Sequence, residues 1–233
     1  MADVSVVMPA FNEAERIVTA MQRVLAQEFV HELIVVDDGS QDATADLAES
    51  IEDPRARLIR QPVNRGKGAA LRTGFAAAQA PFVAVHAADL EYEPADIARL
   101  LPPLRDGRAD VVYGSRFIGS DEHRVLYYWH SVGNRILTTL SNMATNINLT
   151  DMETGTKVFK REVIQSLDLR EDRFGFEPEV TAKVATGGYR IFEAGISYSG
   201  RTYAEGKKIG WRDGVRAVFV IGKYSPLLKR AKR

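Results

Sequence analysis

The sequence contains no cysteine, which excludes disulfide bonds, thiolate metal sites and a cysteine nucleophile. An excess of either charge is also missing, because 31 basic residues balance 31 acidic ones. This balance gives no reason to expect a nucleic-acid-binding protein, so any phosphate site must be local. The most apolar late run, residues 217–221, is far shorter than the ~20 residues of a membrane-spanning helix. Finding no signal-peptide pattern at the start, we expect a cytoplasmic protein.

Apolar residues make up 45% of the 233-residue chain, which is enough for one well-buried α/β domain. In the first half, short runs rich in β-branched residues alternate with stretches of helical apolar spacing. Strands are predicted at residues 4–8, 33–36, 57–59, 82–85 and 110–113. Helices are predicted at residues 13–27, 43–49 and 94–104. A further, alanine-rich helix is predicted to follow residues 64–70 and to end near residue 78. This alternation predicts a mostly parallel sheet with right-handed crossovers.

The second half of the chain has a different pattern. Residues 127–146 show a long helical spacing, and we expect their large apolar side chains to pack in the core: Trp129, Val132, Ile136, Leu140 and Met143. Further strands are predicted at residues 157–159 and 190–196. Residues 173–179 open another helix, and a last helix covers residues 211–224. We find no internal repeat and no linker, which favours a single domain.

An acidic cluster follows the predicted strand at residues 82–85. It contains Asp89, Glu91 and Glu93, directly before a proline that suits the start of a helix. In open α/β sheets, ligands bind beyond the carboxyl ends of the strands, where the loops converge. Carboxylates at such a point can hold Mg²⁺ against a substrate diphosphate. We therefore expect the other functional loops to converge on this stretch.

Two further strand ends carry candidate ligand-binding residues. Asp37 and Asp38 end one strand, where they form either a simple turn or a site for a base, a ribose or a metal. Residues 64–70 are basic and rich in glycine, with Gly66 and Lys67 directly before an alanine-rich helix. Backbone amides and a cation at a helix N-terminus suit a phosphate, although an ordinary surface loop explains the same residues.

Later residues add further charged candidates. Arg116 follows a strand and is a natural phosphate ligand if it points into the same site, whereas a lone arginine is more often a surface ion-pair partner. Glu177 lies in the first turn of a helix, where the helix dipole alone favours an acid. Residues 200–210 combine glycines, cations and aromatic residues, which indicates a loop that meets an anion.

Taken together, these stretches resemble family 2 glycosyltransferases of the GT-A fold. Within that family they resemble the dolichyl or polyprenyl phosphate mannosyl- and glucosyltransferases. Each motif alone is weak, but six occur in the family's order: residues 6–13, 35–40, 64–68, 88–92, 114–117 and 200–208. The resemblance implies a Rossmann-like, mostly parallel mixed sheet flanked by helices. The catalytic domain would cover residues 1–210, with a nucleotide-sugar half at 1–118 and an acceptor half at 119–210.

The resemblance also implies the substrates and the residues that bind them. The donor would be a nucleotide diphosphate sugar, GDP-mannose or a UDP-sugar, and the acceptor a polyprenyl or dolichyl monophosphate, reached by peripheral membrane contact. Implied donor-binding residues are Pro9, Phe11, Glu13, Asp38, Gly66, Lys67 and Ala88. Those implied for the acceptor phosphate are Arg116, Arg201, Lys207 and Lys208. Transfer would proceed in line with inversion, with Asp89, Arg116 and Arg201 as catalytic residues and Glu177 as a base or sugar-orienting group.

The chain departs from the family at the metal motif. The family usually has two aspartates separated by one residue, whereas here Ala87 stands at the first position, leaving Asp89 and Glu91 as ligands for Mg²⁺ or Mn²⁺. Because the flanking motifs are intact, our hypothesis is an engineered substitution. A natural site with weak metal binding is the alternative, and either predicts impaired turnover.

Residues 211–233 form the predicted last helix and a basic tail. The stretch places the apolar residues Val215, Val218, Phe219 and Leu227 beside the cations Lys223, Lys229, Arg230, Lys232 and Arg233. This pattern is compatible with docking on anionic lipid at the inner face of the membrane. A core helix with a solvated tail explains it equally well. Two other functions stay open: a family 2 transferase with a non-lipid acceptor, and a silent nucleotide-sugar-binding protein favoured by Ala87.

Overall fold

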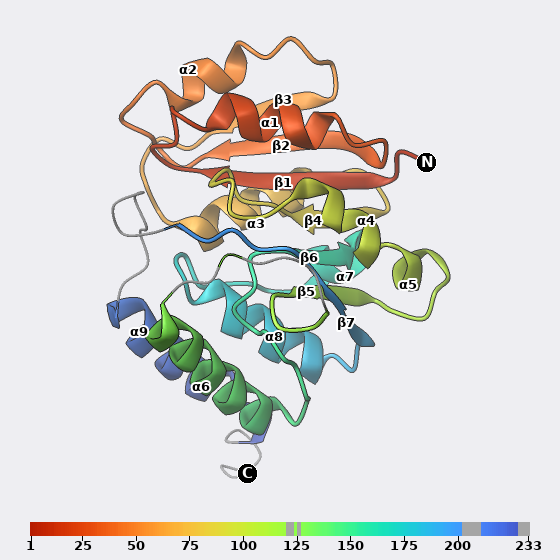
Figure 1. The fold of residues 1–233 in the computed structure, drawn as a ribbon, viewed down its shortest axis with the longest axis vertical. Coiled ribbons are helices and arrows are strands. Elements are labelled where there is room, and N and C mark those ends of the chain that lie inside the picture. Colours follow the sequence, from red (N-terminus) through yellow and green to blue (C-terminus); the bar gives the residue numbers. More distant parts are fainter. Residues whose placement is uncertain (120–123, 125–126, 202–210, 228–233) are drawn as a thin grey trace.

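A seven-stranded mixed sheet runs through the centre of the protein (Figure 1). The computed structural model describes residues 1–119, 124, 127–201 and 211–227. The strands are β1 (Val4–Ala10), β2 (Val30–Asp37), β3 (Ala56–Arg60), β4 (Phe82–Val85), β5 (Val111–Ser115), β6 (Lys157–Lys160) and β7 (Ile191–Gly195). Their order is β3-β2-β1-β4-β6-β5-β7, and only β6 runs antiparallel to its neighbours. The predicted mostly parallel mixed sheet is confirmed.

The central strands are buried on both faces, as their continuous apolar runs predict. Along β1, Val6 and Met8 belong to the core on one face of the sheet, while Val7 belongs to the core on the other. On the second face α3 (Lys67–Ala77) lies very close to β1. A Cβ atom at Gly74 would come within 2.2 Å of Val7 Cγ1, so only glycine allows this approach.

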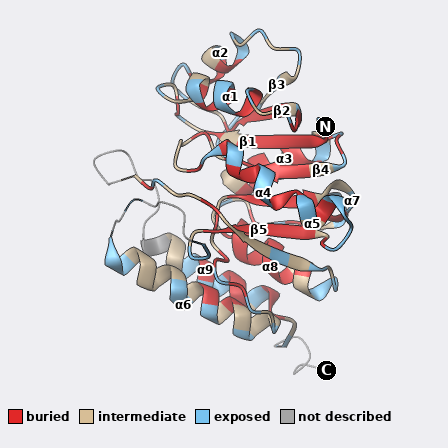
Figure 2. Ribbon diagram, turned by 45° about the vertical axis from the view of Figure 1, so that its right-hand side comes forward, coloured by how far each residue is buried: buried red, intermediate tan, exposed pale blue. Residues whose placement is uncertain are grey.

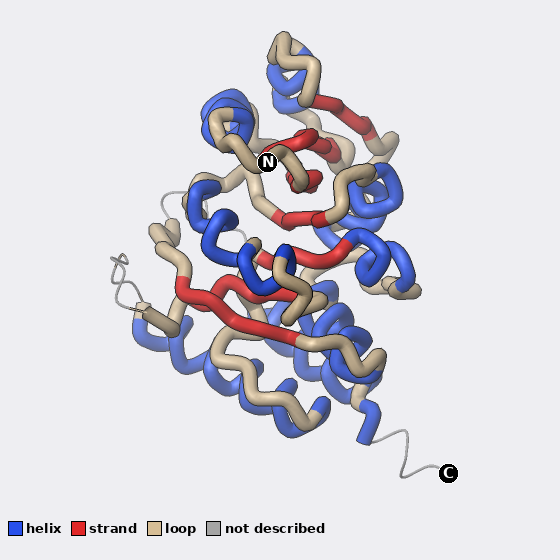
Figure 3. The backbone as a smooth tube through the Cα atoms, turned by 90° about the vertical axis from the view of Figure 1, so that its right-hand side faces the viewer, coloured by secondary structure: helices blue, strands red, loops and turns tan. Residues whose placement is uncertain are grey.

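Helices cover both faces of the sheet (Figure 3). One face carries α1 (Ile17–Leu25), α2 (Thr44–Glu49), the short 3₁₀ helix η1 (Pro94–Asp96), α4 (Ile97–Leu100) and α5 (Pro102–Arg105). The other carries α3, α7 (Arg161–Ser166) and α8 (Phe176–Thr186), with α6 (Tyr128–Thr145) and α9 (Trp211–Tyr224) packed outside α8. The single helix predicted at 94–104 is divided, because Pro102 cannot donate the hydrogen bond that would continue α4.

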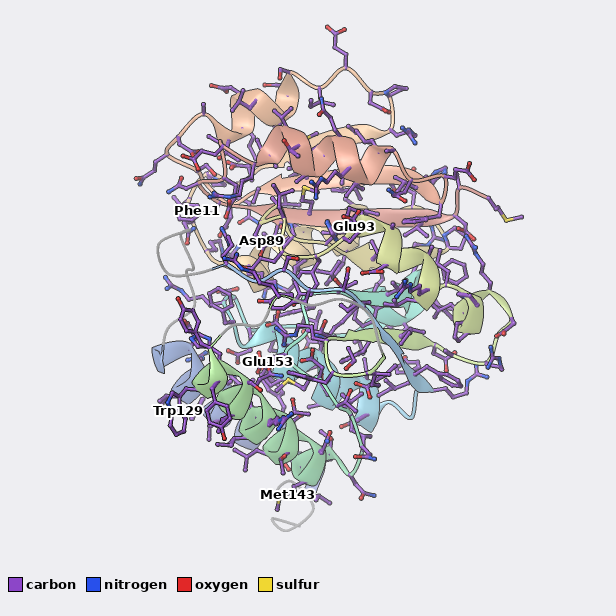
Figure 4. The ribbon with its side chains drawn as sticks, in the orientation of Figure 1. Phe11, Asp89, Glu93, Trp129, Met143 and Glu153 are labelled. Carbon is purple, nitrogen blue, oxygen red and sulfur yellow. The ribbon has the colours of Figure 1, made fainter. Side chains whose placement is uncertain are left out.

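The predicted packing of α6 is wrong for its largest side chains. Trp129 is 77% exposed and Met143 is 68% exposed, and Ile136 is also exposed. Both labelled residues project away from the body of the protein in Figure 4, and Figure 2 shows exposed residues along the helix. The helix has apolar side chains on two sides, and Leu137 and Leu140 are the ones that pack against the core. Periodicity alone does not tell which apolar side faces inward.

Candidate active site

The turn after β4 places Asp89 at the carboxyl end of the sheet, beside the loop that follows β1 (Figure 4). Leu90 has a φ of 60°, a conformation that a non-glycine residue adopts only where its surroundings impose it. This turn lets the Glu91 backbone N–H donate to Asp89 Oδ1 at 3.1 Å. Glu93, the third acid of the stretch, pairs instead with Arg23 on α1.

Arg201 joins the acidic turn from the far end of the chain. Its Nε lies 2.9 Å from Glu91 Oε1, its Nη2 3.7 Å from Asp89 Oδ2 and its Nη1 3.9 Å from Glu13 Oε1. The segment that carries it crosses the sheet after β7, and Tyr198 Oη donates to Glu91 Oε2 at 2.9 Å. One guanidinium thus contacts three of the acids that the sequence assigned to the donor or the metal.

Burial and a neighbouring negative charge act on the pKa of Asp89. Burial, and then the negative charge of Glu91, raises the pKa of Asp89 above its ordinary value. The Glu91 N–H and the positive charges of Arg201 and Lys67 oppose this shift only in part. Another positive charge close to Asp89, from a metal or a ligand, would therefore favour its ionised form.

The acids at this turn make an incomplete metal site. Both carboxylate oxygens of Glu91 already accept hydrogen bonds, from Arg201 and Tyr198, and Ala87 offers no ligand. Among the described residues, no three histidine, aspartate or glutamate side chains form a group that could hold a metal. At many phosphate sites Mg²⁺ is bound by only one or two carboxylates, and oxygen atoms of the substrate supply further ligands. The residues at this turn fit a metal only in that way.

The loops after β1 and β2 are tied together beside this turn. Asp38 accepts hydrogen bonds from the backbone N–H groups of Arg65 at 3.0 Å and Gly66 at 2.6 Å. Thr44 Oγ1 accepts one from the Glu13 N–H at 2.8 Å. Asp38 therefore positions the glycine-rich loop through its side chain.

The remaining residues predicted to bind the donor lie around these loops. Pro9 and Phe11 are half-buried at the end of β1, whereas the side chain of Ala88 is buried in the core under the turn. Ala88 can therefore contact a ligand only through its backbone. Lys207 and Lys208, predicted for the acceptor phosphate, lie outside the described residues.

Lys67 and Glu177, far apart in the sequence, form an ion pair in which Glu177 is buried and Lys67 is half-buried. Lys67 Nζ lies 2.6 Å from Glu177 Oε1, and Glu177 is only 3% exposed. Burial alone would lower the pKa of Lys67, but the charge and the hydrogen bond of Glu177, together with the charge of Asp89, outweigh burial and raise the pKa. The other carboxylate oxygen of Glu177 is buried without a hydrogen-bond partner in the described part of the chain. The pair links the glycine-rich loop to the first turn of α8.

Arg116 is held by a partner that the sequence analysis missed. Its Nε and Nη2 lie 2.6 Å and 2.7 Å from the two oxygens of Asp151, which is fully buried. Burial would raise the pKa of Asp151, but the charge of Arg116 holds it below its ordinary value. The Arg116 guanidinium also stacks on the Tyr198 ring, 5.1 Å from the centroid. Arg116 therefore organises the site, and the signal for its partner was the acidic turn at residues 150–155.

Two titratable residues in this turn and directly after it, Glu153 and Lys157, were also missed. Lys157 is only 1% exposed, and its Nζ donates to the carbonyl oxygens of Met152 at 3.0 Å and Thr154 at 2.5 Å. Burial lowers the pKa of Lys157 to about 8. Burial, and then the negative charge of Glu177, raises the pKa of Glu153 to about 8. At neutral pH Glu153 is therefore mostly protonated while Lys157 is charged.

A family model described as glycosyl transferase family 2 matches residues 5–168. The match covers more than half of the chain and includes the turns that carry Asp38 and Asp89. The chain belongs to glycosyl transferase family 2. It is a glycosyltransferase, as the sequence predicted.

Two curated relatives support the family 2 assignment. The glycosyltransferase AglJ of Haloferax volcanii is 31% identical over 196 residues, which are 84% of this chain and 62% of that protein. The polyprenol monophosphomannose synthase of Mycolicibacterium smegmatis is 29% identical over 215 residues, which are 88% of this chain and 80% of that protein. The predicted resemblance to this branch of family 2 is confirmed.

The fold is similar to that of solved glycosyltransferases. Glucosyl-3-phosphoglycerate synthase from Mycobacterium tuberculosis, crystallised with Mn²⁺, UDP and glucosyl-3-phosphoglycerate, matches with a TM-score of 0.73. The match covers 96% of this chain and 80% of that chain at 21% identity. Another crystal structure of that enzyme contains Mg²⁺ and UDP. The predicted GT-A fold of this family 2 protein is confirmed.

Proposed function

We propose that this glycosyltransferase transfers a hexose from a nucleotide diphosphate sugar to a polyprenyl or dolichyl monophosphate, with inversion. The donor would be GDP-mannose or a UDP-sugar. The observation that carries the proposal is that Arg201 pairs with Asp89 at the carboxyl end of the sheet and that the charge of Lys67, whose loop Asp38 holds, also acts on Asp89. The similarity to a polyprenol monophosphomannose synthase supports the lipid acceptor.

The charges around the turn suit a reaction between two phosphate compounds. Pro9 and Phe11 lie where a nucleoside would approach the end of β1, and Lys67 lies at the N-terminus of α3, where a diphosphate is favoured. Arg116 and Arg201 would meet the acceptor phosphate, with Lys207 and Lys208 from the adjoining sequence. A phosphate oxygen is already ionised at neutral pH, so the attack does not require a general base. Catalysis then consists mostly of alignment, with Glu177 orienting the sugar.

A divalent metal would complete the donor site. Mg²⁺ or Mn²⁺ would be held by Asp89, with Glu91 released from its present partners, and would neutralise charge on the leaving diphosphate. Because Ala87 supplies no carboxylate, we propose that this metal binds weakly. Turnover would then be lower than in a protein with aspartate at this position.

The lipid acceptor requires contact with a membrane surface. Within the described residues, no helix combines the length and the apolar content that crossing a bilayer requires. The exposed apolar side chains of α9 instead offer a docking face, and Phe219 among them is 61% exposed. The exposed Trp129 and Met143 extend this face onto α6, which packs beside α9. The cations of the tail would complement anionic lipid.

The acceptor class is tested by a transfer assay with matched acceptors. The protein is incubated with Mn²⁺ and UDP-glucose or GDP-mannose, together with either polyprenyl phosphate or 3-phosphoglycerate. We expect a lipid-linked sugar phosphate and no transfer to phosphoglycerate. Transfer to phosphoglycerate alone would support the non-lipid alternative. Donor binding without any transfer, persisting in the Ala87→Asp variant, would support the silent binding protein.

Membrane docking is tested by co-sedimentation with vesicles that contain or lack anionic lipid. We expect binding to the anionic vesicles and its loss after removal of residues 226–233, because the cations of that segment meet the lipid headgroups. Unchanged sedimentation of the shortened protein would remove the docking role of the tail.

A further inference from the structure

Two buried carboxylate oxygens lack hydrogen-bond partners among the described residues: Glu153 Oε1 and Glu177 Oε2. Leaving such an oxygen unpaired in the interior costs free energy, so its retention calls for an explanation. Glu177 uses its other oxygen for Lys67, which fixes the direction of its carboxylate. Both glutamates therefore present an acceptor that the rest of the described chain leaves unused.

Both glutamates belong to segments that adjoin the Asp89 turn. The N–H of Gly155, two residues after Glu153, donates to Tyr92 Oη at 3.0 Å. Tyr92 follows Asp89 by three residues, so the two turns are in direct contact. Glu177 is connected to the same turn by Lys67: its carboxylate accepts a hydrogen bond from Lys67, and the charge of Lys67 lowers the pKa of Asp89. The unused acceptors therefore adjoin the point where the donor is proposed to bind.

The surrounding charges restrict what can bind there. Lys67, Lys157 and Arg116 act on these two glutamates, so a further cation would be repelled. A further anion would be repelled by the carboxylate of Glu177, because the positive charge of Lys67 is already paired with that carboxylate. A neutral group that carries hydrogen-bond donors meets both requirements, and the hydroxyl groups of a sugar are such donors. A mostly protonated Glu153 can also donate to a hydroxyl oxygen.

We propose that Glu153, together with Glu177, binds hydroxyl groups of the transferred hexose and so determines which sugar the enzyme accepts. This inference rests on the proposed function, because it places the donor's sugar beside the Asp89 turn. Glu153 would be a specificity-determining residue, since hydroxyl positions are what distinguish one hexose from another. A buried acceptor that loses its hydroxyl stays unpaired, which makes such a site selective.

The test compares sugar nucleotides with their parent nucleotides. Binding of UDP, UDP-glucose, GDP and GDP-mannose is measured by calorimetry for the wild type, Glu153→Gln and Glu153→Asp. The control is Glu162→Gln, which makes the same chemical change at an exposed position of α7. Melting temperatures and circular dichroism establish that each variant is folded, and Glu153→Asp keeps the carboxyl group while withdrawing its oxygens by one methylene.

We expect the wild type and Glu162→Gln to bind one sugar nucleotide more tightly than its parent nucleotide. Glu153→Asp should keep the affinity for the parent and lose up to about ten-fold in affinity for the sugar nucleotide, as for one hydrogen bond. Glu153→Gln should lose less, because its amide keeps an acceptor and a donor, as a protonated carboxyl does. An unchanged preference for the sugar nucleotide in Glu153→Asp would overturn the inference, even if that variant melts at a lower temperature. The carboxylate oxygen would then bind only a buried water molecule. Equal wild-type affinity for parent and sugar nucleotide would overturn the inference alone. Absence of binding to all four probes would overturn the proposed function as well.

Discussion

Replacing Glu153 by glutamine is expected to change how the stability of the protein depends on pH. Burial and the charge of Glu177 raise the pKa of Glu153 from its ordinary 4.5 to about 8. Between these two values, the folded protein holds a proton that the unfolded chain has released. The contribution of this group to stability is therefore complete below pH 4.5 and is lost as the pH rises through 8.

The expected size follows from the width of this window. A proton bound only in the folded state lowers the free energy of unfolding by about 1.4 kcal/mol for each pH unit of increase. Between pH 5 and pH 8 the wild type should therefore lose on the order of 3–4 kcal/mol relative to Glu153→Gln. Above pH 8 the buried Lys157 acts in the opposite direction, because it loses its proton near 8 in the folded state and near 10.5 when unfolded.

Urea unfolding followed by circular dichroism at pH 5, 6.5 and 8 measures this difference. The quantity compared is the free energy of unfolding of the wild type minus that of the variant, which cancels the titration of groups that do not interact with Glu153. Glu162→Gln is the control, and its difference from the wild type should stay level over this range. A difference for Glu153→Gln that also stays level, or that rises with pH, would refute the buried and protonated state assigned to Glu153.

Three other changes test the site. Lys67→Met should destabilise the protein by roughly 3–5 kcal/mol in urea unfolding, because Glu177 is left buried and unpaired. Adding Glu177→Leu to this variant should recover part of the lost stability. If the effects of the two substitutions were simply additive, the pairing would be contradicted. Gly66→Ala should cost more stability than Gly107→Ala, because both have positive φ but only the Gly66 position would clash with neighbouring atoms; equal costs would argue against the close contact. Ala87→Asp should raise the rate of Mn²⁺-dependent transfer at least about ten-fold through tighter metal binding. Equal transfer rates in the wild type and the variant would contradict the assignment of the metal to the Asp89 turn.

Local features of the sequence predicted the framework well. The run at residues 82–85 coincides with β4, and residues 211–224 coincide with α9. β-branched runs and turn residues act over a few positions, so they identify strands without knowledge of the fold. The carboxyl ends of parallel strands must then meet at one edge. The grouping of Asp38 and Asp89 therefore followed from the sequence, because each stands directly after a predicted strand.

The partners of the charged residues were settled by the tertiary structure alone. Asp151 binds Arg116, and Glu177 binds Lys67 across 110 positions of the chain. No local pattern distinguishes these charges from solvated ones, because a buried ion pair is created by the packing of distant elements. The inward side of α6 was undetermined for the same reason. Local patterns in the sequence were therefore enough to predict the fold class, the family and the common end of the strands at which the candidate site residues lie. The packing of distant segments, which no local pattern encodes, decided which charges are buried, which are paired, and which carboxylate oxygens lack a partner among the described residues.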